Sequence, residues 1–98
     1  MPVLRIDRFT ADPDNATEVL SRRNALVDAV RDTVPGLLDA RLAKVDERTW
    51  IDMWRWDTLE NARAAVARAQ EGAFPEAAAA FDLASDVVTE FTEIVDER

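Results

Sequence analysis

The segment 49–56, TWIDMWRW, carries every tryptophan of the chain, at three of its four even-numbered positions. Side chains of a β-strand point alternately to its two faces, so this spacing predicts a strand with three indoles on one face. These are Trp50, Trp54 and Trp56. Asp52 lies among them, whereas Ile51 and Met53 point to the opposite face. A strand that is apolar on both faces belongs in a sheet whose two faces are both covered.

The remaining segments alternate between strand and helix patterns. The expected elements are a strand at 3–9, a helix from Asn15 to Pro35, strands at 37–45 and 49–56, a helix from Asp57 to Gly72, a helical segment at 74–85 and a strand at 86–95. This β-α-β-β-α-β order predicts an α+β, ferredoxin-like fold: one domain, 1–98, with a four-stranded antiparallel sheet and its helices on one face. Asn15 with Glu18, and Asp57 with Glu60, match the pattern of helix capping boxes.

The composition excludes several classes of function. The chain has 98 residues, a net charge of −8 and scattered arginines, which argues against binding to nucleic acid or an anionic membrane. No apolar run is long enough to span a membrane and the first residues lack a signal-peptide pattern, so we expect a cytoplasmic protein. Without histidine, cysteine or tyrosine, the chain lacks a histidine or thiolate metal site, a thiol nucleophile and a histidine base.

Both faces of the predicted sheet are substantially apolar. On the first strand, Val3 and Phe9 oppose Leu4 and Ile6, as the tryptophans oppose Ile51 and Met53 on the third. The helices can cover only one face, and the other would expose a larger apolar patch than a soluble monomer usually shows. We therefore expect a homodimer in which two sheets pack face to face.

The order of the elements, with VPGLL before the hairpin and RWDTLENARAA entering the second helix, resembles the antibiotic biosynthesis monooxygenase family of dimeric α+β barrels. In the quinone-forming members of this family, an Asn and a Trp lie four residues apart on the third strand, and a Tyr lies on the second helix. The resemblance implies that these positions fall on Asp52, Trp56 and Ala62. In its haem-degrading members, a histidine of the last helical segment ligates iron and a strand-one Asn lies beside the haem. PEAAAAF has no histidine and the Asn position falls on Asp7, which argues against haem.

The resemblance implies that the tryptophan face looks into a cavity under the helices. We expect Asp52 and Trp56 to be catalytic, and the substrate-binding residues to be Trp50, Trp54, Asp7, Arg5 and Phe81. A carboxylate enclosed by indoles is desolvated, which favours its neutral form and suits it to accept a proton. The alternative is that the tryptophans are core and that Asp52 forms a salt bridge, for instance with Arg5 or Arg41.

These residues lead to one function with two alternatives. The first is a cofactor-independent monooxygenase that acts on a polycyclic aromatic or polyketide-type metabolite, with no metal and no cofactor. A proton taken by Asp52 would leave an electron-rich substrate anion that reduces oxygen directly. The alternatives are a non-catalytic module that binds a small aromatic ligand, and a cyclase or isomerase that uses Asp52 as a proton shuttle.

Overall fold

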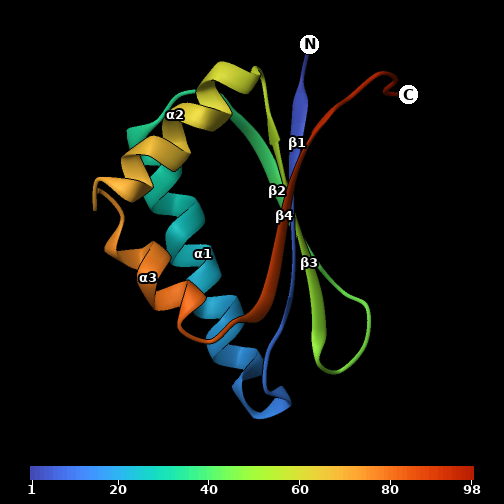
Figure 1. Ribbon diagram of the computed structural model, residues 1–98, viewed down its shortest axis with the longest axis vertical. Helices are drawn as coiled ribbons and strands as arrows, with labels where there is room; N and C mark the ends of the chain where they lie inside the picture. The colour runs from blue at the N-terminus through green and yellow to red at the C-terminus, as the bar shows by residue number, and fades with distance from the viewer.

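A computed structural model describes residues 1–98 and has the predicted order of elements. They are β1 (Val3–Thr10), a 3-10 turn η1 (Pro13–Asn15), α1 (Ala16–Thr33), β2 (Leu37–Lys44), β3 (Thr49–Trp56), α2 (Leu59–Gln70), α3 (Pro75–Phe81) and β4 (Ser85–Glu93). The strands form one antiparallel sheet in the order β2-β3-β1-β4. All three α-helices lie on one face of this sheet (Figure 1). The predicted ferredoxin-like fold is therefore confirmed.

The helix starts differ from the predicted capping boxes. Asn15 precedes α1 but its side chain accepts no capping hydrogen bond, because the chain enters α1 through the 3-10 turn, which Asp12 caps instead. At α2 the cap is one residue later than expected: the Thr58 hydroxyl accepts a hydrogen bond from the backbone N–H of Asn61, at 3.1 Å. The Asp57 carboxylate accepts a hydrogen bond from the Asn61 side-chain amide, at 2.9 Å. This bond links the residue before the cap to the first turn of α2.

The turn between α1 and β2 requires a glycine. Gly36 has a φ of 101°, in the region that disfavours residues with a Cβ. A Cβ at this position would also collide with the side chains of Asp57 and Asn61. The Gly36 carbonyl accepts a hydrogen bond from the backbone N–H of Asp57, at 2.9 Å. This close approach fixes the start of β2 against the start of α2.

The core lies between the sheet and the helices. Its main cluster joins one face of β1 and β3 to the three helices and comprises Val3, Val27, Val30, Val34, Trp54, Trp56, Ala62, Ala65 and Phe74. Along β3, buried and half-buried residues alternate strictly. The prediction that the tryptophans and Asp52 share the helix-side face is confirmed, and Trp56 is only 2% exposed. None of the helices is long and apolar enough to cross a membrane.

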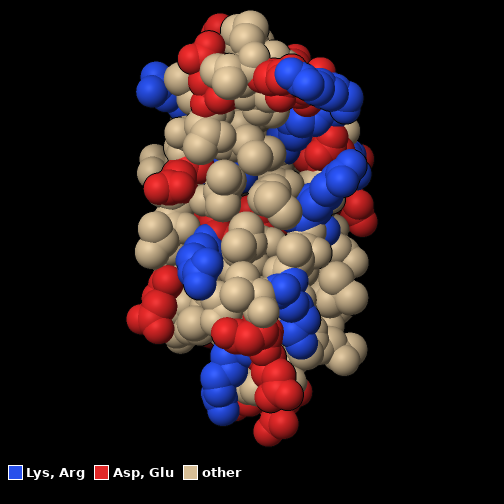
Figure 2. Space-filling model, turned by 90° about the vertical axis from the view of Figure 1, so that its right-hand side faces the viewer, with Lys and Arg blue, Asp and Glu red and all other residues tan.

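The opposite face of the sheet has no helix over it. Leu4, Ile6, Ile51 and Met53 lie on this face of the two central strands, and Val88 of β4 extends the apolar surface at 59% exposure. Figure 2 shows this side of the molecule, where broad uncharged areas are interrupted by separate acidic and basic side chains. Two oppositely charged side chains on it form an ion pair: Arg55 Nε lies 2.7 Å from Asp39 Oδ2.

Candidate functional site

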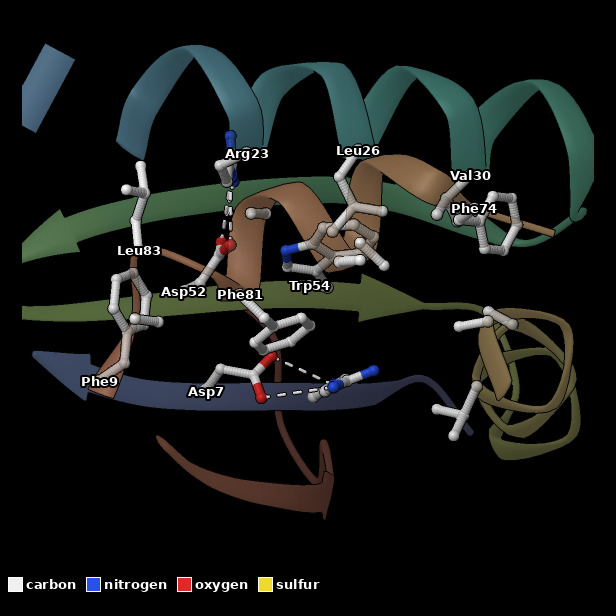
Figure 3. Close-up of a pocket in the computed structure, with 18 of the residues that line it drawn as sticks. Asp7, Phe9, Arg23, Leu26, Val30, Asp52, Trp54, Phe74, Phe81 and Leu83 are labelled. Atoms are coloured by element: carbon white, nitrogen blue, oxygen red, sulfur yellow. Dashed lines mark hydrogen bonds and ion pairs between the residues drawn. The ribbon is translucent and has the colours of Figure 1, made fainter. Parts of the chain in front are cut away.

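A cavity of about 400 Å³ lies between the sheet and the three helices. Side chains of β1 and β3 form its floor, and α1, α2 and α3 form its walls and roof (Figure 3). Sixteen of its 21 lining residues are hydrophobic, so the volume suits an apolar ligand of modest size. Its charged lining residues are Arg5, Asp7, Arg23 and Asp52.

Asp52 forms a two-pronged ion pair with Arg23 of α1. Arg23 Nη2 lies 2.9 Å from Asp52 Oδ1, and Arg23 Nε lies 3.2 Å from Asp52 Oδ2. The two side chains are only 13% and 9% exposed. The expected partners, Arg5 and Arg41, are therefore wrong, because α1 reaches Asp52 from above the sheet whereas Arg41 points to the other face. The carboxylate is thus paired with a cation rather than enclosed by indoles alone.

Arg23 is the charged cavity residue that the sequence reasoning missed, although one signal marked it. It lies four residues after Val19 and four before Val27, and both valines are buried on α1. Residues four apart share one helix face, so an arginine between two buried valines points at the sheet. A buried arginine requires a carboxylate, and Asp52 is the carboxylate within its reach.

Asp7 lies directly opposite Asp52 in the pairing of β1 with β3. Arg5 Nε approaches Asp7 Oδ2 at 3.1 Å, and the Thr89 hydroxyl of β4 donates to Asp7 Oδ1. Asp7 and Arg5 thus form a second ion pair on the cavity floor. Two like charges facing each other across strands are unfavourable, but here each carboxylate has its own arginine. The polar floor of the cavity is therefore formally neutral.

The aromatic residues divide between the cavity and the core. Trp54, Trp56 and Phe81 line the cavity, and Phe81 is 43% exposed at the end of α3. Trp50 does not line it. Its ring stacks on Phe9, with centroids 6.4 Å apart, and carries the ammonium of Lys44 at 5.0 Å on its surface. The structure thus leaves Trp50 in a separate core cluster. It brings the other six of the seven predicted site residues to one cavity: Arg5, Asp7, Asp52, Trp54, Trp56 and Phe81.

Two further positions bear on the chemistry of the site. Arg55 of β3 points away from the cavity. Its hydrogen bond to Asp39 raises its pKa, so it stays a surface cation. Ala62, at the family's tyrosine position, is buried in the core. The side chains contain no group of three or more carboxylates that could hold a metal ion.

The arrangement of elements is shared with solved structures of low sequence identity. SnoaB of Streptomyces nogalater, described as a cofactor-independent oxygenase, superposes with a TM-score of 0.80 at 20% identity, over 98% of this chain and 95% of that one. Rv0793 of Mycobacterium tuberculosis superposes with a TM-score of 0.70 at 21% identity, over 99% and 98%. At this identity the likeness concerns the fold. A search of curated proteins found no match.

The sequence itself matches a family model. The model describes antibiotic biosynthesis monooxygenases, and the match extends over residues 2–77, from the start of the first strand into α3. It therefore includes both paired carboxylates, Arg23 and the whole of β3. The chain belongs to the antibiotic biosynthesis monooxygenase family.

Proposed function

We propose that this protein is a cofactor-independent monooxygenase acting on a polycyclic aromatic, polyketide-type compound bound in the cavity. Asp52 accepts a proton from the compound, and Trp56 holds the ring system against the floor. The observation that carries this proposal is the Arg23–Asp52 ion pair, nearly excluded from water, on the floor of an apolar cavity. Family membership and the likeness to SnoaB support the same class of reaction.

The ion pair suits Asp52 to a proton transfer that leaves an anion behind. Before the transfer, the charges of Arg23 and Asp52 cancel. When the carboxylate takes a proton from an acidic C–H or O–H of the substrate, the guanidinium is left as a cation next to the new anion. Because the side chains of the pair are only 13% and 9% exposed, this attraction is stronger than in solution. Arg23 therefore stabilises the product of the step that Asp52 begins.

The substrate anion then reacts with oxygen. For an acidic methylene carbon, the carbanion adds O2 to form a C–O bond and a peroxide. Loss of the second C–H proton breaks the O–O bond, leaves a ketone and releases hydroxide, which becomes water with the proton held by Asp52. In balance, one methylene compound and one molecule of oxygen give one ketone and one molecule of water. The protein contributes a base, a cation and a dry, shaped cavity.

The remaining site residues have binding roles in this proposal. Arg5 and Asp7 form the second ion pair of the floor and keep it neutral around the bound compound. Trp54 and Trp56 offer flat faces to a ring system. Phe81, half exposed at the end of the short helix α3, forms part of the wall at the edge of the cavity.

We also propose that the protein is a homodimer that joins through the free face of the sheet. The support is the apolar surface opposite the helices, centred on Leu4, Ile6, Ile51 and Met53 and continued by Val88. Two copies packed by this face would cover it while leaving the cavity, on the other side of the sheet, unchanged. The helix-side cavity is complete within one chain.

Oxygen uptake with anthrone as the test substrate separates the proposal from its alternatives. We expect uptake above the spontaneous rate with the wild type and a loss of at least about 100-fold with Asp52→Asn, since general-base catalysis contributes about 10²–10⁴-fold. Trp50→Phe, on the same strand but outside the cavity, is the matched control and should keep the rate. Binding of anthrone without uptake would refute the oxygenase and favour the binding module. Exchange of the substrate's acidic C–H with D2O, again without uptake, would favour the isomerase.

A further inference from the structure

The unpaired polar atoms of the protein gather at one place. Three buried side-chain nitrogen or oxygen atoms have no hydrogen-bond partner: Arg5 Nε, Trp54 Nε1 and Trp56 Nε1. All three belong to residues that line the cavity, and all three are N–H donors. Arg5 Nε at least lies in an ion pair, 3.1 Å from Asp7 Oδ2. The two indoles have no acceptor in the protein.

The acceptors of the cavity floor, in contrast, are already engaged. Both oxygens of Asp52 receive hydrogen bonds from Arg23. Asp7 receives them from Thr89 and from Arg5 Nη2. A buried donor without an acceptor costs free energy, and a ligand that brings an acceptor recovers it. The cavity is therefore complementary to a ligand with oxygen acceptors and an apolar body.

We propose that Trp54 is a recognition residue that donates its indole N–H to a carbonyl or ionised phenol oxygen of the bound aromatic compound. Trp54 is only 7% exposed and its Nε1 is itself buried, so water does not reach this donor, and the indole must turn slightly toward the cavity to meet a ligand oxygen. In Figure 3 the nitrogen end of its ring is turned toward the Asp52 end of the strand, where the reacting part of the ligand lies in the proposed function. This inference rests on the proposed function only in placing the ligand in the same cavity.

A single indole donor gives a definite selectivity. A ligand without an oxygen leaves the buried N–H unpaired, and sites built to hydrogen-bond a polar group discriminate strongly against analogues that lack it. We expect a ketone to bind about tenfold more tightly than the hydrocarbon of the same skeleton, the size of one such hydrogen bond, of about 1.4 kcal/mol. As charge develops on that oxygen during proton removal, the same hydrogen bond strengthens.

The test compares 1-tetralone with tetralin, which share a two-ring skeleton and differ by one carbonyl. Calorimetric titration gives the affinities for the wild type, Trp54→Phe and the matched control Trp50→Phe, whose ring lies outside the cavity. We expect the tenfold preference for the ketone in the wild type and in Trp50→Phe, and its loss in Trp54→Phe, with the affinity for tetralin unchanged.

A second measurement uses the wild type alone and so does not depend on the folding of a variant. The three indole N–H signals of 15N-labelled protein are assigned from the tryptophan substitutions, and the Trp54 signal should move downfield with 1-tetralone but not with tetralin. Equal shifts with both compounds, or an undiminished ketone preference in Trp54→Phe, would overturn the inference. Neither readout involves oxygen uptake, so a protein that selects ketones without consuming oxygen would refute the oxygenase and leave the recognition role of Trp54 intact.

Discussion

Removal of one member of the Arg23–Asp52 pair should destabilise the protein more than removal of both. The side chains are 13% and 9% exposed, so either charge left alone is almost cut off from water. A broken buried ion pair costs about 3–5 kcal/mol, and contact with the cavity places this pair near the lower value. We therefore expect Arg23→Met and Asp52→Leu each to cost about 3 kcal/mol, and the double variant Arg23→Met/Asp52→Leu to cost less than about 1 kcal/mol, since two apolar side chains leave no unpaired charge.

Urea unfolding followed by tryptophan fluorescence measures these costs, at one fixed protein concentration because a dimer unfolds in a concentration-dependent way. With a urea m-value of about 1–3 kcal/mol per M, a cost of about 3 kcal/mol shifts the urea midpoint by about 1–3 M, so the single variants are easily resolved from the wild type. Arg22→Met with Glu18→Leu is the matched control, an Arg–Glu pair on α1, away from the free face of the sheet, with side chains 34% and 56% exposed. Its single variants should shift the midpoint much less. Single-site costs that simply add in the double variant would refute the reasoning, because independent sites do not rescue one another.

Three further predictions follow from other parts of the fold. Gly36→Ala should lower the free energy of unfolding by about 2–4 kcal/mol, measured by urea unfolding, because the new Cβ is strained by the positive φ and overlaps neighbouring side chains. Gly72→Ala, with φ 82° and open space around it, should lower it only by the backbone strain, about 1–2 kcal/mol. Equal costs would contradict the overlap of the Gly36 Cβ with Asp57 and Asn61. Backbone N–H groups of Arg48 and Thr49 lower the pKa of Asp46, so its charge stabilises the folded state above its ordinary pKa of 3.8. Asp46→Asn should therefore be less stable than the wild type at pH 7, and the difference should shrink only as the pH falls below 3.8 and vanish below the lowered pKa of the folded state. Met53→Glu should convert the dimer to a monomer in light scattering with the cavity's ligand affinity retained, and an unchanged mass would contradict the sheet-face dimer.

The sequence predicted best what depends on local periodicity. Alternation along β3 placed three indoles and Asp52 on one face, and the same alternation along β1 placed Asp7 and Arg5 beside them. Both assignments follow from a strand's period of two, which tertiary packing cannot change without breaking the sheet. The antiparallel register then brought Asp7 opposite Asp52.

What the sequence did not predict depends on the packing of one element against another. The partner of Asp52 comes from α1, and only the position of that helix over the sheet decides which of its side chains reaches the floor. Trp50 shares the face of Trp54 but lies at the far end of β3, where Phe9 and Lys44 cover it. α1 begins directly after Asn15, as expected, but the preceding 3-10 turn leaves the Asn15 side chain without a capping hydrogen bond. Local patterns contain none of this information.

The two ion pairs also reconcile the charge of the whole protein with the chemistry of its cavity. A net charge of −8 raises the free energy of an anion anywhere near the protein surface, and a substrate anion is the intermediate that the proposed reaction requires. Arg5 and Arg23 oppose this field at the floor, where little water screens them. The floor is neutral before the proton transfer and carries one positive charge after it, so it attracts the anion only once that anion has formed. In the proposed reaction, two arginines paired with two aspartates thus stabilise the charged intermediate more than the neutral substrate. Neutral amides in place of the two aspartates would stabilise the anion only through hydrogen bonds, without a change in the charge of the floor during the step.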